Sequence, residues 1–387
     1  MKAIEVKKDI YWVGGIDWSL RNFHGYLTQR GSTYNAYLII DEKITLIDTV
    51  KGYLTKELIE RISSIIDPSK IDYVVSNHVE MDHSGAMPEI MAMLPNATVI
   101  TSAAGEKEHK LHYNTENWKF QVVKSGDSVN IGKRNISFVM TPMVHWPDNM
   151  VTYCPEEKIL FSNDAFGQHI ATSERFDDEY SLEIILEEAK KYYANIVLPY
   201  SNQVLGVLEV AKGLDIEMIC PSHGIIWRKN VSSILEGYNK WASNQTDKKA
   251  VIVYDSMWGS TEKMANYIAN AFEDKGYKYE LFDLKSNHIS DIITEVVEAE
   301  YICVGSPTLN KGILPTVASF LTYLQGLAPK GRKAILFGSY GWAQQNMKVM
   351  ERYMQESDIE VVKTFNNNFI PTQEKLCSIT KEVMEII

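Results

Sequence analysis

The sequence predicts an α/β protein of two domains, and three observations support that fold class. Strand-like and helix-like segments alternate along all 387 residues. The polar stretch 242–249 lacks apolar periodicity, which is typical of a linker. A strongly apolar strand at 250–254 follows it at once. We therefore expect a first domain at 1–245 and a second at 249–387, each long enough to bury its own core.

Strands dominate the first domain. Residues 34–40 and 44–48 flank a polar turn, which is the pattern of a hairpin. Apolar residues recur with helical spacing at 55–66, and a short buried strand follows at 73–76. Further strands are expected at 136–140, 151–154 and 159–161. Strands interleaved with helices indicate sheets whose outer faces are covered by helices.

The second domain alternates strand and helix regularly. Its strands are expected at 250–254, 301–305 and 333–338, with helical patterns between them. Such alternation predicts an open parallel sheet with helices on both faces, a doubly wound sheet.

Composition excludes several classes of function. The net charge of −11 disfavours a nucleic-acid partner, because such a surface repels phosphate backbones. No apolar run is long enough to cross a bilayer, and the charged N-terminus has no apolar signal core, so we expect a cytoplasmic protein without a membrane partner. The four cysteines form no C-x-x-C pair, which argues against a rubredoxin-type iron centre in this chain; we expect reduced, mostly buried thiols.

Seven side chains with metal-binding groups follow strand-like runs. Four of them lie within six residues, directly after the strand at 73–76, and the other three come singly: His78, Glu80, Asp82, His83, His145, Asp164 and His223. A lone His or Asp after a strand is more often a turn or capping residue. The clustering of seven favours one metal site assembled from several loops.

The ligand chemistry narrows the metal. Four imidazoles and three carboxylates, with no thiolate, suit iron or another first-row metal better than structural zinc. Two ferrous ions would carry four positive charges, and three carboxylates with one bridging hydroxide would balance them. A neutral site is favoured in a buried, low-dielectric pocket.

Three loops at strand ends in the second domain suit a phosphate-bearing aromatic ligand. Hydroxyls, a glycine and backbone N–H groups at a helix N-terminus can cradle a phosphate, and the first loop contains no lysine for a triphosphate. Aromatic side chains in the third loop offer faces for a planar ring. The loops comprise Ser256, Met257, Trp258, Gly259, Ser260, Thr261; Ser306, Pro307, Thr308, Leu309, Asn310; and Ser339, Tyr340, Gly341, Trp342.

The metal motif resembles His-x-His-x-Asp-His of the metallo-β-lactamase fold, with Glu80 at the second His. Together with the later ligands, it is similar to the flavodiiron family. The resemblance implies an αββα sandwich, with one iron held by His78, Glu80 and His145. It implies that Asp82, His83 and His223 hold the second iron and that Asp164 bridges the two. Residues 249–387 resemble flavodoxin, which implies that the aromatic ligand is FMN.

Three further residues are candidates for roles beside the reaction. His24 is a candidate for proton delivery, Trp146 for packing against the site, and Tyr200 for a weaker supporting contact. An ordinary loop or core role explains each of them about as well. His109 and His112 lie on a charged helical stretch, and we expect both to face solvent.

The resemblance implies an oxygen or nitric oxide reductase in which FMN feeds electrons to a diiron site. Dioxygen would yield water, and nitric oxide would yield nitrous oxide and water. A head-to-tail homodimer or dimer of dimers is also implied, with a separate electron donor, rubredoxin or reduced deazaflavin. The alternatives are a zinc hydrolase of the metallo-β-lactamase type with a flavodoxin domain, and a non-catalytic flavoprotein that only carries electrons or senses gas. Glu80 argues against the first, and the complete ligand set argues against the second.

Overall fold

The computed structural model describes residues 1–387 and divides into two compact units. Unit 1 comprises Met1–Phe23, Thr28–Tyr192 and Asn202–Asn239; unit 2 comprises His24–Leu27, Tyr193–Ser201 and Lys240–Ile387. The main division thus falls near the expected linker. The domain borders at 245 and 249 stay predictions.

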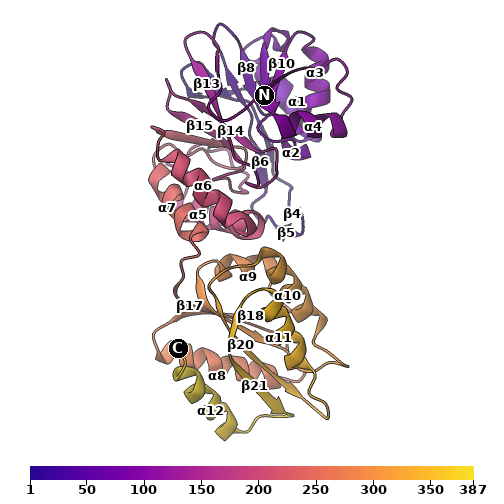
Figure 1. Cartoon of the computed structure of the whole chain (residues 1–387), viewed down its shortest axis with the longest axis vertical. Coiled ribbons are helices and arrows are strands. Elements are labelled where there is room, and N and C mark those ends of the chain that lie inside the picture. Colours follow the sequence, from indigo (N-terminus) through magenta and orange to yellow (C-terminus); the bar gives the residue numbers. More distant parts are fainter. The chain divides into compact units, whose positions relative to one another are not determined.

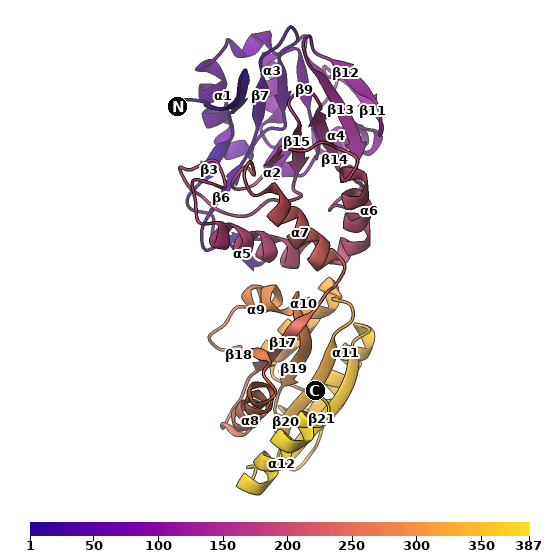
Figure 2. The same cartoon turned by 90° about the vertical axis from the view of Figure 1, so that its left-hand side faces the viewer.

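Unit 1 is built on two sheets (Figures 1 and 2). The first has the order β1-β2-β7-β8-β9-β10-β11, with strands Ile4–Lys7, Ile10–Trp12, Tyr37–Ile39, Thr45–Ile47, Tyr73–Val75, Thr98–Ser102 and Lys119–Val123. The second has the order β12-β13-β14-β15-β16, with strands Ser128–Asn130, Asn135–Met140, Met150–Cys154, Ile159–Asn163 and Met218–Pro221. Two small ribbons pair β3 (Gly15–Asp17) with β6 (Ser32–Tyr34) and β4 (Asn22–Phe23) with β5 (Tyr26–Leu27).

The side chains of the first sheet alternate between two hydrophobic cores, one on each face. In β7, Tyr37 and Ile39 enter the core between the two sheets, whereas Leu38 packs on the opposite face. That opposite face meets buried residues of the helices α1 (Thr55–Ser63) and α3 (Met87–Met93). Alternate residues of a strand point to opposite faces, so a strand covered on both sides is apolar throughout.

The remaining helices of unit 1 lie in the connections. They are α2 (Met81–Ser84), α4 (Ala103–His112), α5 (Leu182–Tyr192), α6 (Ser201–Ala211) and α7 (Val231–Ala242). The expectation that His109 faces solvent is wrong. Its side chain is fully buried in α4, beside the rings of Tyr113, Trp118 and Phe120.

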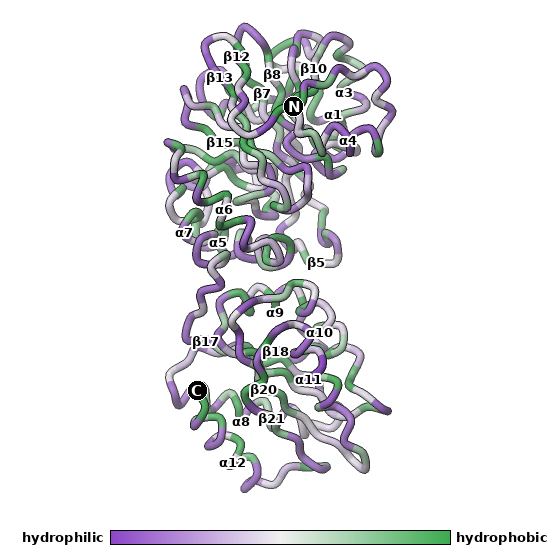
Figure 3. The backbone as a smooth tube through the Cα atoms, in the orientation of Figure 1, coloured by the Kyte–Doolittle hydropathy of each residue, from purple (hydrophilic) through white to green (hydrophobic).

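Unit 2 has one parallel sheet in the order β18-β17-β19-β20-β21. Its strands are Lys278–Asp283, Asp247–Tyr254, Ala299–Gly305, Lys333–Tyr340 and Glu360–Asn368. Hydrophobic residues follow one another along the inner strand β20 (Figure 3). The helices α8 (Ser260–Asp274) and α12 (Gln373–Met384) cover one face, and α9 (Ile289–Val296), α10 (Pro315–Leu327) and α11 (Asn346–Glu356) lie on the other (Figures 1 and 2).

The doubly wound parallel sheet is thereby confirmed, but the two outer strands β18 and β21 were not expected from the sequence. None of the helices in either unit combines the length and the apolar character needed to cross a bilayer.

Candidate metal centre and flavin pocket

The seven expected metal ligands meet at one end of the sheets of unit 1. His78 and Glu80 follow β9, and Asp82 and His83 lie in the short helix α2. His145 lies in the loop between β13 and β14, while Asp164 directly follows β15 and His223 lies just beyond β16. Because β15 and β16 are parallel, their carboxyl ends bring Asp164 and His223 to the same edge.

The ligands form two groups. His78, Glu80, His145 and Asp164 form one, with ligand atoms within 4.8 Å of one another; Asp82, His83 and His223 form the other. Asp164 faces both groups: its Oδ2 lies 3.6 Å from Nε2 of His78 and 3.4 Å from Nε2 of His145. Its Oδ1 lies 2.9 Å from Nε2 of His83 and 3.3 Å from Nε2 of His223.

These spacings suit ligands that share a metal. Bonds of about 2.1 Å place neighbouring ligand atoms about 3.0 Å apart at right angles and about 3.4 Å apart at tetrahedral angles. Nε2 of His145 lies 3.3 Å from Oε2 of Glu80, and Nε2 of His223 lies 3.3 Å from Oδ2 of Asp82. A carboxylate with one oxygen in each group can bridge two metals.

Buried atoms without hydrogen-bond partners also point to metal ions. Both carboxylate oxygens of Asp82 and of Asp164, and Nε2 of His83, are buried and accept or donate no hydrogen bond. An unsatisfied buried polar atom is costly, and a bound cation removes that cost. The residues present therefore fit two metal ions.

In the metal-free site, the carboxylates and imidazoles shift the pKa values of one another. Burial acts to raise the pKa of the Asp164 carboxyl, but the nearby imidazoles of His83, His145 and His223 hold it well below its usual range. Burial acts to lower the pKa of His145, but Asp164 and Glu80 raise it to about 9. Metal binding therefore displaces protons from imidazoles.

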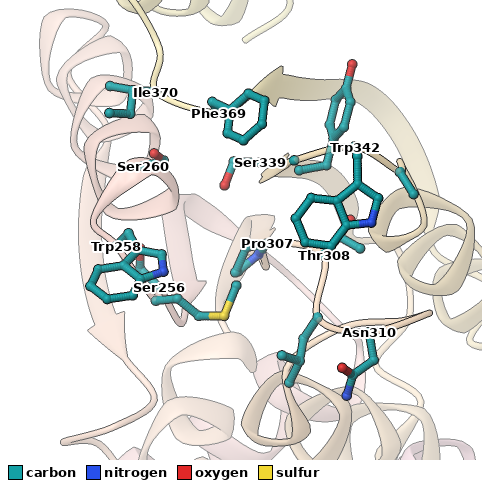
Figure 4. A pocket seen from close by; sticks show the side chains of 15 residues that line it. Ser256, Trp258, Ser260, Pro307, Thr308, Asn310, Ser339, Trp342, Phe369 and Ile370 are labelled. Atoms are coloured by element: carbon teal, nitrogen blue, oxygen red, sulfur yellow. The ribbon is translucent and has the colours of Figure 1, made fainter.

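A cavity of about 550 Å³ lies at the carboxyl ends of the strands of unit 2. It is lined by Ser256, Met257, Trp258, Ser260, Pro307, Thr308, Leu309, Asn310, Ser339, Tyr340, Gly341, Trp342, Ala343, Phe369 and Ile370. Trp258 and Trp342 stand on opposite sides of it, with exposed fractions of 92% and 96% (Figure 4). Two exposed indoles facing a cavity of this size suit a planar aromatic ligand.

Three of the expected cavity residues support the walls instead of lining them. Gly259 has a φ of 81°, caps α8, and donates from its N–H to Oγ of Ser256 at 3.0 Å. Oγ of Ser306 accepts a hydrogen bond from N–H of Leu314 at 3.1 Å. Thr261 is buried, and its hydroxyl has no hydrogen-bond partner in the protein, which leaves it available to a phosphate at the N-terminus of α8.

Comparison with known proteins identifies the family. A family model described as ODP family beta lactamase matches residues 33–224, and one described as flavodoxin matches residues 252–368.

The nitric oxide reductase of Moorella thermoacetica is 47% identical over 93% of this chain and 92% of its own length. The rubredoxin-oxygen oxidoreductase of Megalodesulfovibrio gigas is 44% identical over 92% of this chain and 89% of its own length. The flavodiiron protein from Giardia intestinalis matches with a TM-score of 0.97 at 34% identity, covering 100% of this chain and 96% of that one. The chain belongs to the flavodiiron family. Its expected fold, a metallo-β-lactamase-like unit followed by a flavodoxin-like unit, is confirmed.

The three supporting candidates of this flavodiiron chain have different surroundings. The ring centroid of Trp146 lies 5.1 Å from that of His78, so Trp146 packs directly on a ligand. His24 is exposed, with a φ of 50°, and belongs to unit 2. Tyr200 ends a 3-10 turn and also belongs to unit 2. Of the three, Trp146 is therefore the candidate that packs on a ligand.

Sequence analysis missed several residues around the metal ligands. Nδ1 of His78 lies 3.0 Å from both oxygens of Asp148, and Nδ1 of His223 lies 2.9 Å from the carbonyl oxygen of Thr33. The rings of His169 and Tyr192 lie 4.7 and 5.9 Å from that of His223. Asp148 follows His145 by three residues in a polar loop, which is the one signal that could have drawn attention to it.

The flavin pocket also contains residues that were not expected. Ala343 extends the third loop, and Phe369 and Ile370 follow the unexpected strand β21. Lys285 lies behind the phosphate loop: its Nζ donates to the carbonyl oxygen of Ser256 at 2.8 Å and lies 3.3 Å from Oδ1 of Asp255. It follows β18, the other edge strand.

Proposed function

We propose that this chain is a flavodiiron oxidoreductase that reduces dioxygen to water, nitric oxide to nitrous oxide, or both, at a diiron centre supplied with electrons by FMN. The observation that carries this proposal is the position of Asp164 between two ligand groups of mixed nitrogen and oxygen donors. When bound, iron supplies binding and reduction of the gas, and FMN supplies single electrons.

The residues of the chain supply geometry and access. His78, Glu80 and His145 would hold one iron, and Asp82, His83 and His223 would hold the other, with one oxygen of Asp164 available to each. The side chains of Glu80 and His145 are 11% and 12% exposed, whereas the other ligands are at most 3% exposed. The gas therefore reaches the pair from the side of Glu80 and His145. Trp146 packs on His78 and limits the entry of water.

The flavin is held by the three loops expected from the sequence. Residues 256–261 bind the phosphate, and residues 306–310 and 339–342 bind the ring system. Trp258 and Trp342 lie on opposite sides of the cavity, which supports this assignment (Figure 4).

The electron donor is a separate protein of the rubredoxin type, with reduced deazaflavin as the alternative. Support comes from the relative named rubredoxin-oxygen oxidoreductase. The four free cysteines, three of them buried, suit the reducing cytoplasm.

The active form is a head-to-tail dimer in which the flavin of one subunit serves the iron pair of the other. Complementation tests this arrangement. One variant lacks the bridging ligand (Asp164→Asn), and a second has a blocked flavin pocket (Ser260→Trp). After both are unfolded and refolded together, hybrid dimers should regain gas reduction that neither variant shows alone. A mixture that stays inactive although hybrid dimers form would contradict electron transfer between subunits.

Anaerobic turnover with reduced rubredoxin tests the activity itself. Nitric oxide and then dioxygen are supplied to the iron- and FMN-loaded protein, and the ratio of the two rates identifies the preferred gas. The zinc hydrolase alternative predicts zinc at two per chain, ester cleavage and no gas consumption. Metal analysis of the same preparation distinguishes the two functions.

A further inference from the structure

We propose that the two metal positions are inequivalent, and that Asp148 makes the position held by His78, Glu80 and His145 the tighter-binding and more electron-rich one. We call this position 1, and the position held by Asp82, His83 and His223 position 2. The inference rests on the diiron centre of the proposed function and concerns how the protein distinguishes its two halves.

Position 1 has an anionic partner behind one of its ligands. Both carboxylate oxygens of Asp148 lie 3.0 Å from Nδ1 of His78, and Asp148 is 1% exposed. The N–H of Val79 donates to Oδ2 of Asp148 at 2.7 Å, and the hydroxyl of Ser102 donates to its backbone carbonyl at 2.8 Å. Hydrogen bonds to its side chain and to its backbone carbonyl thus hold Asp148 in one orientation.

At position 2, no carboxylate accepts a hydrogen bond from Nδ1 of either imidazole. Nδ1 of His223 donates to the neutral carbonyl of Thr33 at 2.9 Å. Nδ1 of His83 is buried and has no hydrogen-bond partner. The two positions otherwise match, because each has two imidazoles, one carboxylate of its own and one oxygen of Asp164.

A carboxylate that accepts the outer N–H of an imidazole raises the basicity of the other ring nitrogen and fixes the ring towards the metal. In a buried site this negative charge is weakly screened, so it also stabilises a more oxidised metal. Removal of such a partner typically lowers metal affinity about 10- to 100-fold. We therefore expect position 1 to fill first and to have the lower reduction potential.

The test is an anaerobic titration of metal-free protein with ferrous iron, compared with Asp148→Asn. The wild-type chain should bind two ferrous ions in two phases. In Asp148→Asn, the tighter phase should weaken about 10- to 100-fold, so that the phases converge. The lower of the two iron reduction potentials should rise, which a merely structural role of Asp148 would not cause.

Two further variants keep the test decisive. Asp177→Asn neutralises a buried carboxylate that accepts from the N–H groups of Arg228 and Asn230 and from no metal ligand, so it should leave both phases unchanged. Asp148→Glu keeps the charge and should retain two phases even if Asp148→Asn does not fold.

Different results of the titration would contradict the inference and the proposed function. Two ions bound with equal affinity by the wild-type chain, or unchanged phases in Asp148→Asn, would overturn the inference and leave the diiron centre intact. Binding of fewer than two ions would instead contradict the proposed function.

Discussion

Asp164 is the residue on which both proposed metal positions depend. One of its oxygens faces each ligand group, and neither has another partner. Asp164→Asn leaves one neutral amide oxygen in place of two anionic ones, so both positions lose charge and one loses a ligand. We expect iron content to fall from two to below one per chain at equal free iron, with FMN content unchanged.

Metal analysis and flavin absorbance of the same sample check this prediction. Asp177→Asn is the matched control, because it changes a buried carboxylate of unit 1 that contacts no ligand. Retention of two irons per chain in Asp164→Asn would show that Asp164 does not bridge.

Lys285 shows how one exposed charge can tune the phosphate loop. Its ammonium lies between Asp255 and Asp283, two carboxylates that would otherwise repel a phosphate at the N-terminus of α8. Because the side chain is 52% exposed, solvent screens its charge and the effect should be small. We expect Lys285→Met to weaken FMN binding about two- to fivefold and to leave riboflavin binding unchanged.

Fluorescence titrations of flavin-free protein with FMN and with riboflavin separate the effect of phosphate from that of the ring. Lys333→Met is the control, since Lys333 pairs with Glu300 at the amino end of β20. An equal loss of affinity for both flavins would mean that Lys285 supports the loop without acting on the phosphate.

At the scale of elements, the turn after β16 positions His223. Gly224 has a φ of 78°, and a Cβ at this residue would overlap the side-chain oxygen and the backbone carbonyl of Gln168. Gly224→Ala should therefore lower the free energy of unfolding by about 1–3 kcal/mol and displace His223. Gly206 in α6 has open space around it, so Gly206→Ala should be neutral or stabilise by up to about 1 kcal/mol.

Thermal unfolding of the two glycine variants checks the contrast, and iron content reports the displacement of His223. A Gly224→Ala chain as stable as the wild type would mean that the turn relaxes without cost.

The elements that sequence analysis found and missed differ in burial. The central strands β17, β19 and β20 are apolar because helices cover both of their faces, and such strands are evident in a sequence. The edge strands β18 and β21 are partly exposed and carry polar residues, so no apolar run marks them. Missing β21 also meant missing Phe369 and Ile370 in the flavin pocket.

In the candidate site, too, sequence analysis found the residues that a local pattern marks and missed those that the fold brings in. Ligands could be identified because His and carboxylates clustered at strand ends, and the structure brings all seven together. His169 approaches the ligands only through the fold, and its local sequence does not signal this. For Asp148 the only signal is its position three residues after His145. His109 was assigned to solvent because its helix is charged, whereas aromatic residues outside that helix bury it.

At the scale of the whole molecule, each cofactor belongs to one unit. The metal ligands all lie in unit 1, and all the lining residues of the flavin cavity lie in unit 2. A ligand that binds only the folded state stabilises it by about 2.7 kcal/mol at a concentration one hundred times its dissociation constant. Removing a cofactor should therefore destabilise its own unit first.

We expect calorimetry of the loaded protein to resolve two unfolding transitions. Chelation of iron should move one of them to lower temperature, because Asp82 and Asp164 then keep buried charges without a metal partner. Removal of FMN should move the other. If chelation of iron lowered both unfolding temperatures equally, the two units would unfold as one. The loss of iron would then also destabilise the flavodoxin-like unit. Separate shifts would support the proposed division at 245–249, because each half of the chain would respond to its own cofactor alone.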